Sequence, residues 1–202
     1  MVKQTRHFEN LKTTLAIADA EHLDEQLAPD NSFDAVFGNC VLQIVNDPEQ
    51  TLREAYRVLA PGGRAGFTTW GSKENSDFMT VYSKCVMKVD KFKEMMVKAN
   101  VRSLWHLSDP KPVLDYMESI GFKNCRSMEL FAYSTFDGES CEDLFKKHAE
   151  YSTYDLRIKL ESDEDHILLD EVCVEAVKNA YSILNDERRP LGFYSILYWG
   201  DK

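Results

Sequence analysis

Short apolar runs, each closed by polar or turn-forming residues, recur in the first third of the chain. Leu15–Ala18 is one run and stops at Asp19, and Phe33–Phe37 is a second that Gly38-Asn39 closes. Runs of this length between turn residues are typical of buried parallel strands. The pattern therefore predicts two strands here, joined through the turn residues 29–32.

A helical pattern follows the second strand. Asp47 is a suitable N-cap and Pro48 fits the first helical position. Apolar residues then recur at helical spacing, at Leu52, Ala55, Tyr56 and Leu59. Pro61-Gly62-Gly63 should end this helix and turn the chain into a third strand, Arg64–Thr69. The order strand, helix, strand predicts parallel pairing with a right-handed crossover, and hence an α/β doubly wound fold.

The remaining two-thirds of the chain reads as helices with two further strands. Residues 75–100 are methionine-rich, which favours core or lid packing over a cofactor site. We expect further helices over 110–120, 141–151 and 166–184 and strands over 124–134 and 191–199. A single domain, 1–202, is predicted, in which 15–71 forms the core βαβ segment and 75–105 and 141–185 form a helical cover or lid.

Composition and charge narrow the classes of partner. The net charge is -10, which disfavours nucleic acid and anionic lipid, so small molecules and proteins are the expected partners. Neither a membrane-spanning run nor a signal-like N-terminus is evident, which predicts an intracellular, cytoplasmic protein. The 5 cysteines lack C-x-x-C spacing and the histidines are scattered, so we expect reduced thiols and no metal site.

Three segments share a pattern with a known family. They are Ala18–Leu23, Asp30–Val36 and Leu52–Arg64. Together with Pro29, which precedes the second segment, they contain D-A-E-x-L, P-D-x-S-F-D-x-V and R-E-x-x-R-V-L-x-P-G-G. In this order and spacing the chain resembles the class I S-adenosylmethionine-dependent methyltransferases, of the ubiquinone, menaquinone and sterol type (methyltransferase domain 11-like). The match is strong over residues 15–71 and looser beyond. The resemblance implies S-adenosylmethionine as the cofactor.

The resemblance also implies roles for individual residues. Asp19 stands where the family places an acid at the adenine amino group, and Ala20 offers a backbone amide there. Asn39 lies where the family's cofactor and substrate meet. The structural alternatives are that Asp19 caps the following turn and that Asn39 is a turn residue. Gln43 stands where relatives often carry histidine, and no catalytic residue is identified.

The chain departs from the family at its beginning. The family opens with a strand, a G-x-G-x-G loop, a helix and a second strand with a ribose-binding acid, whereas residues 1–10 look like the next helix and no glycine precedes Gly38. We therefore expect a partial Rossmann-like sheet without its first two strands. An N-terminally truncated pseudoenzyme with impaired cofactor binding, serving as a scaffold or regulatory subunit, is the first hypothesis. The alternative is an active small-molecule methyltransferase whose cofactor loop comes from a partner chain or a longer parent protein.

The missing strands also affect the sheet itself. Strand 33–37 should have an exposed edge, and such edges invite pairing. We expect the edge to be covered, either by the Leu15–Ala18 strand or by another chain in a homodimer or with a protein partner.

Overall fold

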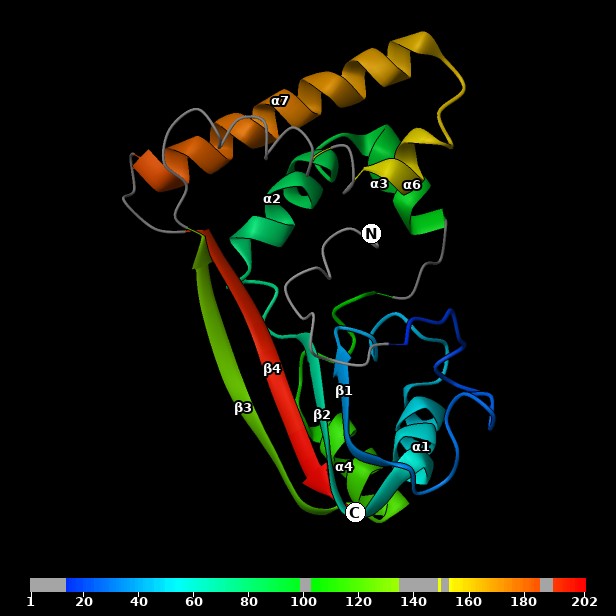
Figure 1. Ribbon diagram of the computed structural model, residues 1–202. Coiled ribbons are helices and arrows are strands. Elements are labelled where there is room, and N and C mark those ends of the chain that lie inside the picture. The colour runs from blue at the N-terminus through cyan, green and yellow to red at the C-terminus, as the bar shows by residue number, and fades with distance from the viewer. Residues whose placement is uncertain (1–13, 99–102, 135–148, 150–152, 186–190) are drawn as a thin grey trace.

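A four-stranded sheet and two groups of helices form the molecule (Figure 1), seen in a computed structural model that describes residues 14–98, 103–134, 149, 153–185 and 191–202. The sheet has the order β1-β2-β4-β3. Its strands are β1 (Phe33–Asn39), β2 (Leu59–Trp70), β3 (Lys123–Ser134) and β4 (Leu191–Asp201). The helices are α1 (Pro48–Val58), α2 (Asp77–Val86), α3 (Asp90–Lys98), α4 (Lys111–Ile120), α6 (Tyr154–Arg157) and α7 (Asp163–Asn185). The mixed α/β architecture confirms the predicted partial Rossmann-like fold.

The predicted strand, helix, strand unit is present. β1 and β2 are parallel, with Phe37 opposite Gly66, and α1 connects them. Asp47 caps α1 by accepting from the Gln50 amide at 2.9 Å, as its sequence predicts. β2 begins at Leu59, earlier than predicted, and includes the turn residues 61–63. Pairing of Phe33 with Leu59 extends the ladder across that turn.

The second half of the sheet reverses direction. β4 lies between β2 and β3 and runs antiparallel to both of them. Parallel pairing is therefore confirmed for β1 and β2 only. α4 ends at Gly121, whose φ of 117° is a left-handed conformation that glycine adopts at little cost, and β3 follows directly.

One face of the sheet is packed beneath α1 and α4. The helices and the sheet together form one core of fully buried apolar residues, among them Leu52, Leu59, Phe67, Met117 and Tyr198. A second core lies between α2, α3 and α7 and includes Tyr82, Phe92 and Leu169. The 75–100 segment is thus helical and supplies core residues, although Met87 and Met96 are exposed. The division into one domain with a helical cover stays a prediction.

The opposite face of the sheet carries several exposed apolar side chains in the described part of the chain. On β1 every second residue, from Phe33 through Phe37 to Asn39, is exposed, and Phe37 retains 67% of its accessible surface. Register places Gly66 and Trp199 beside Phe37, and Leu197 and Met128 in the next row. Met128 is also exposed, whereas Leu197 and Trp199 are half-buried. We call the side that carries Phe33, Phe37, Met128, Leu197 and Trp199 the open face.

The outer edge of β1 is unpaired in the described part of the chain, as the sequence predicts, and the Leu15–Ala18 segment does not cover it there. Within the described residues β1 pairs only with β2. Residues 14–18 form no strand, and the Ile17 side chain is fully exposed, so the predicted strand Leu15–Ala18 is wrong. A strand requires a neighbour for its backbone groups, and the described part of the chain gives this segment none.

Other predictions fall partly or wholly outside the described residues. The helix expected over residues 1–10 lies outside them, as does nearly all of the predicted helix over 141–151. The predicted helix over 166–184 is α7, which begins earlier, at Asp163, because the acidic run forms its first turn. Of the helices in the described part of the chain, none has both the length and the apolar character needed to cross a bilayer.

Candidate functional site

The carboxyl ends of β1 and β2 form the end of the sheet at which open α/β folds bind their ligands. Asn39 closes β1, and its Oδ1 accepts a hydrogen bond from the Thr68 hydroxyl at 2.7 Å. The next residue, Cys40, has a positive φ of 52° and donates its N–H to the Thr68 carbonyl and hydroxyl oxygens. Thr68 of β2 therefore fixes the point at which the chain leaves β1. The Asn39 side chain stays exposed at this end.

Gln43 anchors the loop that follows β1. The residue is 2% exposed, and its Oε1 accepts from the Trp70 N–H at 3.2 Å. Its Nε2 has no hydrogen-bond partner among the residues that the structure describes. Trp70 in turn packs on Trp105, with ring centroids 5.1 Å apart. An amide with this role holds the loop against the end of β2, and its nitrogen does not act as a base.

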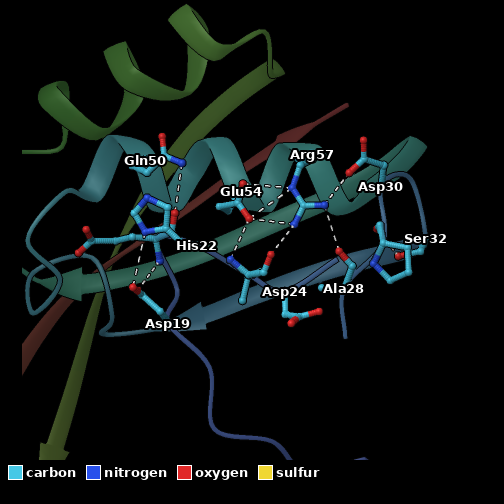
Figure 2. A network of polar contacts seen from close by, with 12 residues as sticks. Asp19, His22, Asp24, Ala28, Asp30, Ser32, Gln50, Glu54 and Arg57 are labelled. Carbon is cyan, nitrogen blue, oxygen red and sulfur yellow. Dashed lines mark hydrogen bonds and ion pairs between the residues drawn. The ribbon is translucent and has the colours of Figure 1, made fainter. Parts of the chain in front are cut away.

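Asp19 begins a loop that runs alongside α1 (Figure 2), and Ala20 follows it in the chain. The Asp19 Oδ1 accepts from the Glu21 N–H at 2.9 Å, and its Oδ2 lies 3.5 Å from the His22 Nδ1. The carboxylate therefore caps its own turn, as the structural alternative predicted. Its side chain is nevertheless 65% exposed, which leaves room for a further donor.

Glu21 fastens this loop to the beginning of α1. Its Oε1 accepts from the amides of Asn46 at 2.6 Å and Asp47 at 3.1 Å, and its carbonyl oxygen accepts from the Gln50 side chain at 3.1 Å. Because α1 starts beside the carboxyl end of β1, these contacts bring Asp19 and Ala20 to the same end of the sheet as Asn39. No described hydrogen bond or ion pair joins Asn39 to either of them.

Arg57 fastens the rest of the loop to the same helix (Figure 2). Its guanidinium pairs with Glu54 at 2.9 Å and Asp30 at 2.5 Å. It also donates to the carbonyl oxygens of Leu23 at 3.2 Å and Ala28 at 3.1 Å. Glu54 in turn accepts from the Leu23 N–H at 3.0 Å. We call Glu54, Arg57 and the loop groups they bind the loop clamp.

The electrostatics of the loop clamp follow from this geometry. Hydrogen bonding to Arg57 lowers the pKa of Glu54, which outweighs the opposing effect of burial. The hydrogen bond with Glu54 raises the pKa of Arg57, and the hydrogen bond with Asp30 raises it by a smaller amount. Both groups therefore remain charged at neutral pH, and a charge-assisted network holds the loop.

Sequence reasoning missed Glu21, Glu54 and Arg57. All three lie within the segments that carry the family resemblance, and Glu54 and Arg57 have the i, i+3 spacing of neighbours on a helix. Those two signals together could have identified the loop clamp. No group of metal-ligating side chains occurs in the part of the chain that the structure describes.

Part of the chain is similar in sequence to known methyltransferases. Residues 1–67 match the family described as a methyltransferase domain. The chain is 28% identical over 108 residues to the ubiquinone/menaquinone biosynthesis C-methyltransferase UbiE of a Ruegeria species, covering 50% of this chain and 43% of that protein. It is 49% identical over 39 residues to an arsenite methyltransferase of Aquipseudomonas alcaligenes, covering 19% and 11%. The chain thus spans less than half the length of these relatives.

Solved structures show the same fold. A crystal structure of a protein assigned as a methyltransferase of an antibiotic biosynthesis pathway, from Anabaena variabilis, superposes with a TM-score of 0.57 at 13% identity. The match covers 90% of this chain and 71% of that one. Residues 1–67 are therefore similar to a methyltransferase domain, and the chain shares the fold of a protein assigned as a methyltransferase.

Proposed function

We propose that this methyltransferase relative binds S-adenosylmethionine only weakly by itself and serves as a scaffold or regulatory subunit. The observation that carries the proposal lies at the carboxyl end of the sheet, where groups suited to adenine are present in the described part of the chain but groups suited to the rest of the cofactor are lacking there. The loop of Asp19 and Ala20 is held in place by Glu21 and the loop clamp, so it suits the adenine edge. Among the described residues, the groups that would hold the remainder of the cofactor have no counterpart beside this loop.

The fit of Asp19 and Ala20 to adenine follows from their chemistry. The exposed carboxylate of Asp19 accepts from an exocyclic amine, and a backbone N–H at Ala20 donates to a ring nitrogen. Bound S-adenosylmethionine would supply the electrophilic methyl group for transfer. Asn39 lies at the end of β1, where its side chain is bonded to Thr68 of β2, and would border the acceptor.

The expected weakness of binding follows from the groups that are lacking. Between Thr14 and Phe37 the chain has no glycine, so no loop there allows the close backbone approach that the methionine end requires. Two or three hydrogen bonds at about 1 kcal/mol each hold the adenine. Affinity from these contacts should be weaker than about 0.1 mM.

A second candidate function rests on the open face and the bare edge of β1. A partner chain or a longer parent protein that covered them could supply the missing cofactor contacts, and the assembly would then be an active small-molecule methyltransferase. Its catalysis would come mainly from holding the acceptor in line with the methyl group. The short span of this chain relative to its relatives favours this candidate too.

Calorimetric titration of the chain with S-adenosylmethionine tests the proposal. We expect an affinity weaker than about 0.1 mM that falls further in Asp19→Ala. Glu25→Ala, an exposed acid of the same loop, is the matched control and should bind like the unaltered chain. Tight one-to-one binding at micromolar concentration would overturn the first candidate, and equal binding by Asp19→Ala would remove Asp19 from the site.

An intracellular location is also part of the proposal. The four described cysteines, Cys40, Cys85, Cys125 and Cys173, are free thiols, and two of them are buried. Unpaired cysteines are typical of proteins in reducing compartments. Fractionation of cells that express the tagged chain checks this inference.

A further inference from the structure

A cavity between α2 and α7 is separate from the candidate functional site. α7 lies over α2 at the top of Figure 1, and the two helices share a buried apolar core. Beside that core they border a cavity of about 300 Å³, a size at the lower end of the range for small-molecule sites. Its lining residues are Asp77, Val81, Lys84, Cys85, Lys88, Asn179, Ser182 and Ile183. None of these belongs to the loop of Asp19 or to the carboxyl ends of β1 and β2.

The charges that line this cavity favour an anionic ligand. The Asp77 carboxylate is 7% exposed and pairs with the Lys84 ammonium at 3.1 Å, so these two charges offset each other. Lys88, in the turn after α2, is exposed and has no ion-pair partner among the described residues. Two lysines against one aspartate give the lining one net positive charge, on a chain whose overall charge is -10. A locally cationic cavity attracts anions and disfavours cations.

The remaining lining groups narrow the class of anion. The Asn179 Nδ2 donates to the Cys85 Sγ at 3.3 Å, and the same nitrogen has a second N–H with which to bind an acceptor. Val81 of α2 and Ile183 of α7 supply apolar wall from both helices. A ligand that contacts both kinds of group needs an anionic head and an apolar body. One net positive charge matches a carboxylate better than a phosphate, which carries up to about two negative charges at neutral pH.

We propose that the cavity between α2 and α7 binds a small apolar carboxylate. The carboxylate pairs with the Lys88 ammonium and accepts from the Asn179 amide, and the hydrocarbon part packs on Val81 and Ile183. A charge-assisted contact fixes the head, and removal of apolar surface from water supplies the rest of the affinity. The site is distinct from that of S-adenosylmethionine, so this proposal does not depend on whether the chain binds that cofactor.

Octanoate is a suitable probe, because it joins a single negative charge to a hydrocarbon chain. Calorimetric titration at pH 7 compares it with octylammonium and with butanoate. We expect octanoate to bind at least about tenfold more tightly than octylammonium, which has the wrong charge, and than butanoate, which buries less apolar surface. Bound octanoate should also slow the alkylation of Cys85 by iodoacetamide, followed by mass spectrometry of the peptide that contains it, because this thiol lines the cavity.

Substitutions of the exposed Lys88 test the assignment of the head group. Lys88→Ala should weaken octanoate binding about tenfold, whereas Lys88→Arg keeps the charge and should largely retain binding. Lys93→Ala is the matched control, since Lys93 is also an exposed lysine but lies on α3 outside the cavity, and it should bind octanoate unchanged. Equal affinity for octylammonium, undiminished binding by Lys88→Ala, or unaltered alkylation of Cys85 in the presence of octanoate would refute the proposal.

Discussion

The two parts of the loop before β1 are held very differently. From Leu23 to Asp30 the loop is bound to α1 by Arg57 and Glu54, whose side chains are 22% and 13% exposed. Asp19, at the other end, has recorded polar contacts in the described residues only with Glu21 and His22 of its own turn, and it stays 65% exposed. Residues that carry the family resemblance thus divide into those that position the loop and one that is free to meet a ligand.

Arg57→Ala should have the largest effect, because it removes the group that joins four loop and helix residues. We expect a loss of about 3 kcal/mol in the free energy of unfolding, since the substitution leaves the Glu54 carboxylate half-enclosed without its cation. Urea denaturation measures the change. Arg53→Ala is the matched control on the same helix: its pair with Glu49 is solvent-exposed, so a loss below about 0.5 kcal/mol is expected. Similar losses in the two variants would show that the clamp does not stabilise the fold.

Glu54→Gln should have an intermediate effect that depends on pH. At pH 7 we expect a loss of about 1–2 kcal/mol, because a charge-assisted pair becomes a neutral one. The pKa of Glu54 is lowered in the folded state from its ordinary value of 4.5. The ionised carboxylate therefore contributes to the free energy of unfolding above that pH, and this contribution declines as pH falls through the folded-state pKa. Urea titrations of both proteins from pH 7 to pH 3 should therefore converge at the acid end. A difference that is constant with pH would contradict this assignment.

The sequence predicts those elements whose signals are local. Asp47-Pro48 marks the start of α1, and Gly121 marks the end of α4. The strand at Leu15–Ala18 was predicted wrongly, because an apolar run becomes a strand only where another strand can pair with it. The direction of β4 depends on contacts with β2 and β3 that no local pattern encodes.

The candidate site was predictable in part. Asp19, Ala20 and Asn39 came from family resemblance, and the structure brings them to one end of the sheet without joining them. The loop clamp was missed, since Arg57 meets Leu23 and Ala28 across some 30 positions of sequence. Long-range hydrogen bonds to backbone oxygens have no signature in residue type.

Glu21→Gln should have a smaller effect than either clamp substitution. Glu21 accepts from two amides just before α1, and glutamine can still accept from one or both, although without a full negative charge. We expect a loss of about 1 kcal/mol, measured by urea denaturation. Glu25→Gln, in the exposed part of the same loop, should cost nothing measurable. A loss of free energy as large as that expected for Arg57→Ala would mean that the position of the whole loop depends on the contacts of Glu21.

Asp19→Asn should have the smallest effect on stability and yet the clearest effect on ligand binding. The exposed side chain keeps an oxygen that can accept from the Glu21 N–H, so the free energy of unfolding should change by less than about 0.5 kcal/mol. Binding of adenosine, followed by calorimetry, should weaken, because an amide oxygen is a poorer acceptor for an amine than a carboxylate. If the substitution instead destabilised the fold as Glu21→Gln does, Asp19 would belong with the residues that position the loop, and the division between the two ends of the loop would fail.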